Sequence, residues 1–245
     1  MPRSGRRSFP SEGIGVGSER IASLLGRTSL FGELDERALE LISKRALIRS
    51  YRKGDGIFYQ GDPGTALFVV AEGDVMVYVT SPEGEDMVLA RLGSGETFGE
   101  LALVDGGART ASARALSSVS LVAIPRDAFA AMLRDHPDLT EALLRSLGAL
   151  LRRILEQASD LVFLDLQGRV AKLLVGLADR HGCEVEGGIQ LDLGMSQSNL
   201  AGMVGGSRPT VNQILKSFEA KGYVQLTGRQ ILVKAPDRLR RRAGL

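Results

Sequence analysis

Residues 98–113, FGELALVDGGARTASA, bring a carboxylate, a guanidinium and a hydroxyl together in one short segment with three glycines. Gly99 lets a ligand approach the backbone closely, and Glu100 begins a turn or short helix whose N–H groups can point at an anion. Arg109 can neutralise a phosphate, Thr110 can add a hydrogen bond, and a carboxylate can accept one from a ribose hydroxyl. The segment therefore predicts a pocket for a cyclic phosphodiester. The alternative is a loop in which Glu100 and Arg109 only pair with each other.

Residues 196–226 have the pattern of two helices separated by a glycine turn. Ser196 and Ser207 are suitable N-caps, and Pro209 falls in the first turn of the second helix, where its missing N–H costs nothing. Apolar residues occupy one face of each helix: Leu200, Ala201, Val204, Val211, Ile214, Leu215 and Phe218. Three polar side chains remain free to point outward: Arg208, Asn212 and Gln213. This pattern predicts a helix-turn-helix whose second helix enters the major groove of DNA.

The elements that must position these two segments change character along the chain. Residues 19–47 form short amphipathic helical groups, whereas residues 48–124 contain brief β-rich runs punctuated by glycines. The latter pattern is typical of an antiparallel sandwich or barrel. Pro125 is expected in the first turn of a short helix. The remaining predicted elements are helices over 138–163 and 166–180, a loop over 182–188, a strand over 189–193 and a final hairpin.

The helix predicted over 138–163 carries two apolar stripes. The first has the a/d spacing of a coiled-coil seam, with Gln157 in its one polar slot: Leu143, Leu147, Leu150, Ile154 and Leu161. The second stripe consists of Leu144, Leu151, Leu155 and Ala158. Two stripes indicate two partners, so we assign the first to a homodimer seam and the second to the sandwich of the same chain.

Charge is distributed unevenly over the 245 residues. Residues 19–164 carry 16 basic and 21 acidic side chains, a net charge of −5, whereas residues 165–245 carry 12 basic and 7 acidic, a net charge of +5. A polyanion should therefore prefer the C-terminal part. The basic run at 238–242 can add phosphate attraction or form a solvated face.

Several classes of protein are disfavoured by the composition. The single cysteine, Cys183, excludes an intrachain disulfide framework, and His136 and His181 lack metal-ligand spacing. The sequence has no Ser/His/Asp or Cys/His set and no phosphate-binding GlyLysSer/Thr motif, which argues against an enzyme. It also has no apolar run of membrane-spanning length and no signal peptide. We expect a cytoplasmic protein without a membrane partner, with residues 1–18 disordered.

Residues 98–113 resemble the phosphate-binding cassette of the cyclic-nucleotide-binding domains shared by CRP/FNR bacterial regulators and protein kinase A regulatory subunits. The resemblance implies that Gly99 and Glu100 meet the ribose, that Arg109 and Thr110 meet the phosphate, and that Leu101 adjoins them. Cyclic AMP is the favoured ligand, with cyclic GMP or no ligand as alternatives.

The base of that nucleotide is less well specified. In the best-known cyclic-AMP receptors, a Thr-Ser or Thr-Asn pair on the dimer helix hydrogen-bonds the adenine. Alignment on Phe163, Leu164 and Asp165 puts Ile154 and Leu155 there, and neither can hydrogen-bond a base. Adenine would then be held by packing. In some eukaryotic relatives a Thr after the Arg favours cyclic GMP, so Thr110 keeps that nucleotide open.

The C-terminal segment strongly resembles the winged helix-turn-helix of the same family, and the likeness covers about residues 22–235 in all. The residues implied in DNA binding are Ser196, Gln197, Ser207, Arg208, Pro209, Thr210, Asn212, Gln213 and Arg229 in the wing turn. Arg208 can read guanine, and Ser207 and Thr210 suit phosphates. Pro209 and Gln213 replace a frequent Glu and a frequent Arg, so the half-site need not be the familiar TGTGA.

The expected fold class is α+β: an N-terminal cyclic-nucleotide-binding β-roll, a long dimerisation helix and a C-terminal winged helix-turn-helix. The expected domain bounds are 1–18, 19–136, 137–164 and 165–245. Such a protein is expected to be a homodimeric regulator that binds pseudo-palindromic double-stranded DNA when a cyclic nucleotide is bound. A ligand-independent DNA-binding regulator and a nucleotide-dependent protein adaptor are the alternatives. RNA polymerase is a further candidate partner, through residues 181–188.

Overall fold

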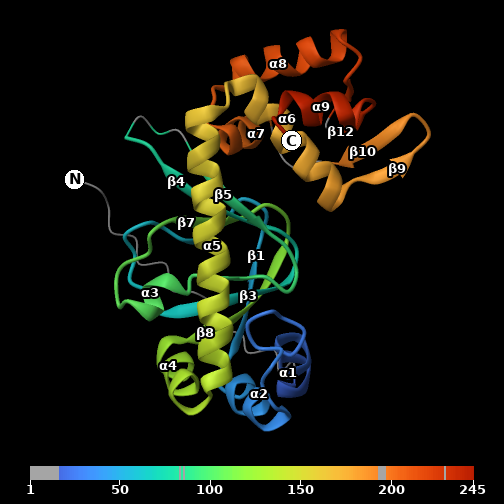
Figure 1. The fold of residues 1–245 in the computed structure, drawn as a ribbon. Helices are drawn as coiled ribbons and strands as arrows, with labels where there is room; N and C mark the ends of the chain where they lie inside the picture. The colour runs from blue at the N-terminus through green and yellow to red at the C-terminus, as the bar shows by residue number, and fades with distance from the viewer. Residues whose placement is uncertain (1–16, 83, 85, 193–196, 229) are drawn as a thin grey trace.

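The computed structural model describes residues 17–82, 84, 86–192, 197–228 and 230–245. A β-rich part and a smaller C-terminal part are joined by one long helix, α5 (Pro137–Phe163), which runs along the β-rich part (Figure 1). This arrangement confirms the predicted α+β class and its order of β-roll, long helix and helix-turn-helix.

The β-rich part is built from two four-stranded antiparallel sheets, with strand orders β1-β8-β3-β6 and β2-β7-β4-β5. The strands are β1 (Leu47–Tyr51), β2 (Gly56–Phe58), β3 (Ala66–Glu72), β4 (Val75–Thr80), β5 (Asp86–Leu92), β6 (Thr97–Phe98), β7 (Ser112–Ala115) and β8 (Val119–Pro125). Buried side chains from both sheets form one cluster, including Phe68 and Leu121 of the first sheet and Val75 of the second. The sandwich predicted from the glycine-punctuated runs is confirmed.

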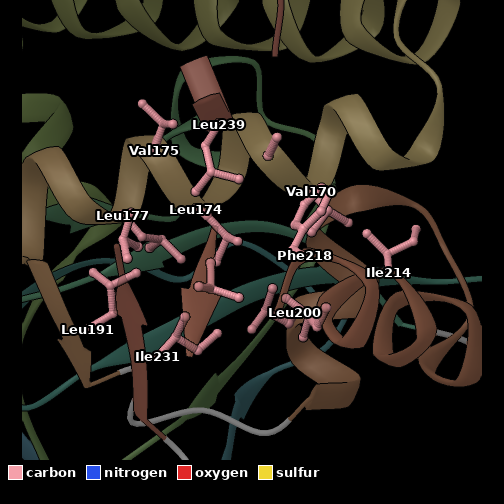
Figure 2. Packing of buried hydrophobic residues seen from close by; sticks show 14 of the residues in the cluster. Val170, Leu174, Val175, Leu177, Leu191, Leu200, Ile214, Phe218, Ile231 and Leu239 are labelled. Atoms are coloured by element: carbon pink, nitrogen blue, oxygen red, sulfur yellow. The ribbon is translucent and has the colours of Figure 1, made fainter. Parts of the chain in front are cut away.

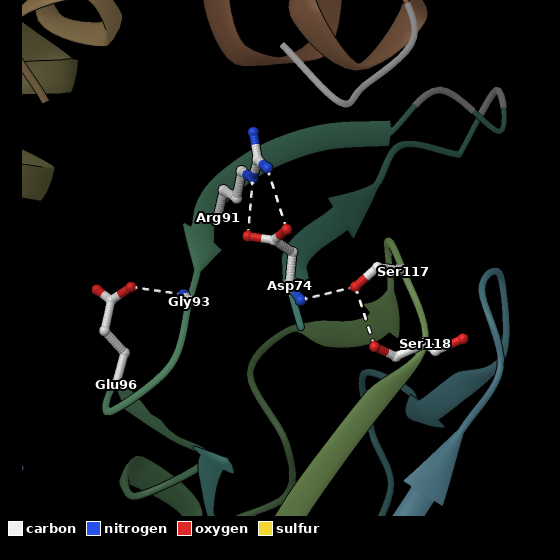
Figure 3. A network of polar contacts seen from close by, with 6 residues as sticks. All are labelled: Asp74, Arg91, Gly93, Glu96, Ser117 and Ser118. Carbon is white, nitrogen blue, oxygen red and sulfur yellow. Dashed lines mark hydrogen bonds and ion pairs between the residues drawn. The ribbon is translucent and has the colours of Figure 1, made fainter. Parts of the chain in front are cut away.

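Polar contacts fix the base of the β4–β5 hairpin (Figure 3). Arg91 donates two hydrogen bonds to the carboxylate of Asp74, at 3.2 and 3.1 Å, and the Asp74 N–H donates to Ser117 Oγ at 2.9 Å. Because Ser117 lies between β7 and β8, these bonds hold the hairpin to the strand that follows the predicted pocket segment.

Short helices close the end of the sandwich opposite the C-terminal part (Figure 1). They are α1 (Ser18–Leu25), α2 (Glu36–Ser43) and α4 (Arg126–Asp135), and a single turn, α3 (Leu101–Val104), follows β6. The rings of Phe31 and Phe129 pack edge to face with their centroids 6.2 Å apart. Pro125 was expected inside the first turn of α4. It is instead the last residue of β8 and the N-cap, because the strand continues up to the helix.

Helix α5 packs on the β-rich part with a different stripe from the one predicted. Leu143, only 4% exposed, is buried with Leu139 and Ala142, and Leu147 packs against the same cluster. Leu144 and Leu151, assigned to that role from the sequence, are 63% and 57% exposed. The assignment of the two stripes is therefore wrong for the first half of α5, whereas farther along the helix Ile154 and Leu161 of the first stripe are both 49% exposed. Both stripes have helical spacing, and only the position of the sandwich decides which one is covered.

The C-terminal part consists of helices around a small sheet of order β11-β12-β10-β9. Its elements are α6 (Leu166–His181), β9 (Cys183–Val185), β10 (Gly188–Asp192), α7 (Gln197–Val204), α8 (Arg208–Ala220), β11 (Val224–Thr227), β12 (Gln230–Val233) and α9 (Pro236–Arg242). Val170, Leu174, Leu200, Phe218 and Ile231 meet in its core (Figure 2). Residues 182–188 were expected to be a loop, but β9 pairs with β10 there as a hairpin, whose turn contains Gly187 at φ +89°.

Candidate functional site

The pocket segment lies where β6 ends and α3 begins. Gly99 follows β6 with φ +85°, in the left-handed region that favours glycine. A Cβ atom at this position would lie 2.6 Å from Nη1 of Arg109. Glycine is therefore required here both by the backbone conformation and by the close approach of the guanidinium. The absence of a side chain at position 99 leaves the space that the guanidinium of Arg109 occupies.

Arg109 is 4% exposed, and its side chain is fixed by backbone groups of β3 and of the residue that follows β6. Nη1 donates to the carbonyl oxygen of Gly99 and Nη2 to that of Ala66, each at 2.6 Å. The guanidinium carbon lies 4.2 Å from the centroid of the Phe58 ring, within cation–π distance. A permanent positive charge is thus held in one place beside α3.

The charges of Glu100 and Arg109 shift each other's pKa, although Glu100 Oε2 accepts no hydrogen bond from the described residues. Burial raises the pKa of the Glu100 carboxyl, against the opposing effects of a backbone hydrogen bond and the positive charge of Arg109. Burial likewise lowers the pKa of Arg109, against the negative charges of Glu100 and Asp62. Glu100 Oε2 and Arg109 Nε are buried and have no hydrogen-bond partner among the described residues. Buried polar atoms are normally satisfied, so a polar ligand that bonds them fits this site.

The other predicted pocket residues are more exposed than Arg109. Leu101 is the half-buried first residue of α3, and Thr110 is exposed next to Arg109. Ile154 and Leu155 lie on α5 and are 49% and 60% exposed, on the side of the helix that the sandwich leaves uncovered. The structure thus brings Gly99, Glu100 and Arg109 together and leaves Ile154 and Leu155 on an open helix face.

The predicted DNA-reading surface is the exposed side of α8. Ser207 is its N-cap and accepts a hydrogen bond from the N–H of Thr210 at 3.4 Å, while the two hydroxyls lie 2.8 Å apart. The side chains of Arg208, Pro209, Thr210 and Gln213 are exposed, and Asn212 is half-buried. The opposite face of α8, formed by Val211, Ile214, Leu215 and Phe218, is buried in the core (Figure 2). Gln197 is the half-buried first residue of α7, and the predictions for Ser196 and Arg229 lie outside the described residues.

Sequence reasoning missed one part of this surface, the start of α6. Asp165, Leu166 and Gln167 line a groove with Thr210 and Gln213 of α8. Asp165 is the N-cap of α6 and accepts a hydrogen bond from the Gly168 N–H at 2.8 Å. The N-capping aspartate is the sequence signal that locates this helix start, but only the packing of α6 beside α8 places it on the same surface.

The C-terminal part also contacts the β-rich part through α7. A Cβ atom at Gly202 would lie 2.5 Å from the backbone oxygen of Asp86 in β5, so the helix rests directly on this strand. Asp86 forms a salt bridge with Arg114 of β7 at 3.0 Å, and both residues line a groove that also includes Arg208. The helix-turn-helix therefore shares an interface with β5 and β7, and β7 begins at Ser112 within the pocket segment.

Two features are absent from the described ranges. No group of three or more His, Cys, Asp or Glu side chains is arranged to hold a metal ion. Within the same ranges, none of the helices combines the length and the apolar character needed to span a membrane.

Comparison with known proteins agrees with both sites. The profile of the cyclic nucleotide-binding domain matches residues 48–136, and that of the Crp-like helix-turn-helix domain matches residues 168–242. The CRP-like cAMP-activated global transcriptional regulator of Mycobacterium tuberculosis is 35% identical over 220 residues, covering 90% of this chain and 98% of that protein. The chain belongs to the CRP/FNR family of transcriptional regulators.

Other members of the CRP/FNR family are similar over comparable lengths. The cyclic AMP receptor protein of Thermus thermophilus is 36% identical over 201 residues, which cover 80% of this chain and 88% of that protein. The solved structure of CLP, a c-di-GMP-responsive global regulator from Xanthomonas campestris, superposes with a TM-score of 0.73 at 26% identity. That superposition covers 81% of this chain and 99% of the other. This protein is accordingly a CRP-family regulator with a cyclic-nucleotide-binding domain and a DNA-binding domain.

We predict that Glu100→Gln stabilises the protein in the absence of a ligand. The raised pKa means that ionised Glu100 opposes folding. This penalty is absent below the ordinary pKa of 4.5, grows as the pH rises from there to the folded value, and is constant above it. Removing the charge should raise the free energy of unfolding at pH 7.5 by about 1 kcal/mol, and the gain should shrink near pH 4.5. Urea unfolding at the two pH values measures both effects.

Glu184→Gln, which removes an exposed carboxylate from β9, serves as the control and should change neither value. A lower stability of Glu100→Gln at pH 7.5 would contradict the prediction, because it would mean that the carboxylate is stabilised by a bond within the protein.

Proposed function

We propose that this protein is a homodimeric transcription regulator that binds a pseudo-palindromic DNA site when a cyclic nucleotide, preferentially cyclic AMP, occupies each pocket. The observation that carries the proposal is the buried guanidinium of Arg109 beside Glu100, with one unsatisfied polar atom on each. A phosphodiester would supply a negatively charged acceptor for Arg109 Nε. A ribose hydroxyl would supply a hydrogen-bond donor for Glu100 Oε2.

Within this proposal, Arg109 and the Thr110 hydroxyl bind the cyclic phosphate. Glu100 accepts from the ribose hydroxyl, and Gly99 and Leu101 provide the close backbone contact. The names of the M. tuberculosis and T. thermophilus relatives support cyclic AMP. The name of CLP indicates that the same fold also serves a different nucleotide, c-di-GMP. Cyclic GMP remains the alternative ligand because of Thr110, which follows Arg109. Ile154 and Leu155 would hold the base by apolar packing alone.

Nucleotide control requires that the ligand bind the DNA-competent arrangement more tightly than the other arrangement. The contact of α7 with β5 supports such control. The helix-turn-helix packs on the sheet that contains β5, and the same sheet contains β7, which follows the pocket residues. A nucleotide that moves β7 or α5 would change this contact and hence the position of α8.

A second candidate is a DNA-binding regulator that needs no nucleotide. It is favoured by the hydrogen bonds of Arg109, whose two Nη atoms already donate to Gly99 and Ala66. A guanidinium satisfied in this way can serve the fold alone. A protein adaptor that does not bind DNA, and an enzyme, are less well supported, since the relatives are named as transcription regulators.

The location and further partners follow from the proposed role. A regulator of this kind works on chromosomal DNA, which supports a cytoplasmic location. RNA polymerase is the proposed partner for activation, through residues 181–188. This range contains β9, with Cys183 exposed, and the turn of the β9–β10 hairpin, which projects from the side of the C-terminal part (Figure 1).

The deciding experiment is selection of bound duplexes from a randomised DNA pool, in parallel without nucleotide, with cyclic AMP and with cyclic GMP. A palindrome enriched only with cyclic AMP supports the whole proposal. Equal enrichment in all three supports the ligand-independent regulator. Enrichment in none would contradict DNA binding under these conditions and favour the adaptor.

Arg109→Gln should abolish measurable cyclic AMP binding, because the neutral amide cannot neutralise the phosphate. We expect the affinity to fall at least about 100-fold, equivalent to roughly 3 kcal/mol, by isothermal titration. Arg114→Gln is the matched control, since Arg114 is a half-buried arginine on the following strand that pairs with Asp86. Unchanged affinity in Arg109→Gln would contradict the pocket assignment.

The proposed dimer seam is the stripe that the sandwich leaves open. It consists of Leu144, Leu151, Leu155, Ala158 and Val162, at spacings of seven, four, three and four. Leu151→Glu should therefore produce monomers at micromolar concentration, because burying each leucine stabilises the dimer by roughly 1.5–3 kcal/mol. Sedimentation velocity measures the change. Leu41→Glu, at an exposed leucine on α2, should remain a dimer.

Arg208→Ala should weaken binding to the selected DNA by about 1–3 kcal/mol and relax the preference for one guanine in each half-site. Lys216→Ala removes the same charge from an exposed position farther along α8, so it should weaken binding to all sequences alike. Competition binding with single-base variants of the site separates the two effects. An unaltered base preference in Arg208→Ala would remove this residue from base recognition.

A further inference from the structure

The connection between α5 and α6 is only two residues long. Leu164 and Asp165 are both extended, with φ/ψ of −107°/133° and −66°/168°, and helical residues adjoin them on each side. Any change in these four angles rotates the C-terminal part relative to α5. The groups that contact Leu164 and Asp165 therefore influence where the DNA-reading surface points.

Residues near the C-terminal end of the chain bind Asp165 and lie close to Leu164. Arg242, the last residue of α9, forms an ion pair with Asp165 and lies 3.5 Å from Oε1 of Gln167. A Cβ atom at Gly244 would lie 3.8 Å from Cδ2 of Leu164. The contact with Asp165 spans 77 positions of the sequence, so α9 connects the end of the domain to its beginning.

Helix α9 is held in this position by contacts separate from the hinge. Leu239 is fully buried in the core of the C-terminal part, and Ala243 is buried with it. Arg240 forms a salt bridge with Asp179, in the last turn of α6, at 2.9 Å. Because these contacts hold α9 against α6, they also fix the position of Arg242 next to Asp165.

Asp165 is bound from two sides. Its Oδ1 caps α6 by accepting from the Gly168 N–H at 2.8 Å, and its Oδ2 pairs with Arg242. Gly168 permits the close approach of α9, since a Cβ atom there would lie 3.4 Å from both Nη1 and the backbone oxygen of Arg242. The cap and the ion pair together restrict the rotation of Asp165.

We propose that α9 is a clamp on the α5–α6 hinge and that Arg242 is the positioning residue that fixes the DNA-reading surface relative to α5. The clamp acts through Asp165 and touches neither the nucleotide pocket nor the proposed base-reading side chains. Its effect on DNA binding rests on the proposed function, whereas its effect on the hinge does not.

The size of the expected effect follows from the exposure of the pair. The side chains of Arg242 and Asp165 are 35% and 62% exposed, and partly exposed ion pairs contribute little to global stability. The same contribution changes a local opening equilibrium about two- to fivefold. Arg242→Gln should therefore leave the melting temperature nearly unchanged and loosen the hinge.

The test measures hydrogen exchange in the full-length protein without DNA or nucleotide, by mass spectrometry of a peptide covering residues 164–172. Arg242→Gln should speed exchange at the start of α6 about two- to fivefold. Arg241→Gln removes the same charge from the same last turn of α9, at an exposed position, and should have no effect. Equal exchange in the two variants would overturn the clamp.

Asp165→Asn provides an independent check, because the amide oxygen can still cap α6 but carries no charge. It should speed exchange as much as Arg242→Gln, and the double variant should show no further increase. Fully additive effects would overturn the proposal by showing that the two side chains act separately.

A DNA arm distinguishes this proposal from the proposed function. Arg242→Gln should weaken binding to the selected site about two- to fivefold more than Arg241→Gln, with equal binding of both to unrelated duplex. If the wild-type protein selects no DNA site while the exchange results hold, the proposed function fails and the clamp stands. If hinge exchange changes but site affinity does not, the positioning role of Arg242 is overturned.

Discussion

A buried guanidinium must replace the hydrogen bonds that it gives up to water, and this requirement organises the β-rich part of the protein. Arg109 meets it with the carbonyl oxygens of Gly99 and Ala66 and with the face of Phe58. The strands β2, β3 and β6 are thereby tied to the segment that precedes β7. The positive left-handed φ of Gly99 is the local condition for this arrangement, since a side chain there would displace the guanidinium.

The same arrangement leaves Glu100 in an unfavourable state, which the proposed ligand would relieve. Its carboxyl is partly desolvated, its pKa is raised, and one oxygen has no partner among the described residues. The ionised carboxylate of Glu100 thus lowers the stability of the ligand-free protein, at a position where the proposed ligand needs a free acceptor. Binding of a ribose hydroxyl would recover that loss, which makes ligand affinity and apo stability opposing demands on one residue.

Helix α5 and the hinge after it connect the β-rich part to the DNA-reading surface of α8. One face of α5 is covered by the sandwich through Leu143 and Leu147, and the face that carries Leu151 and Leu155 is open. Beyond the hinge, α7 rests on β5 through Gly202, and α9 holds Asp165. We infer that the orientation of α8 depends on both contacts, of which only the first is made by the helix-turn-helix itself.

The sequence by itself determined the family and the type of most elements, and it predicted the chemistry proposed for both sites, because these depend on residue types and short spacings. The cassette around Gly99 and Arg109 and the buried face of α8 are examples. Only the tertiary structure decided which stripe of α5 is covered, that residues 182–188 form a hairpin, and that Arg242 reaches Asp165. Helical periodicity tells which side chains share a face, but the partner of that face is set by packing between segments far apart in the chain.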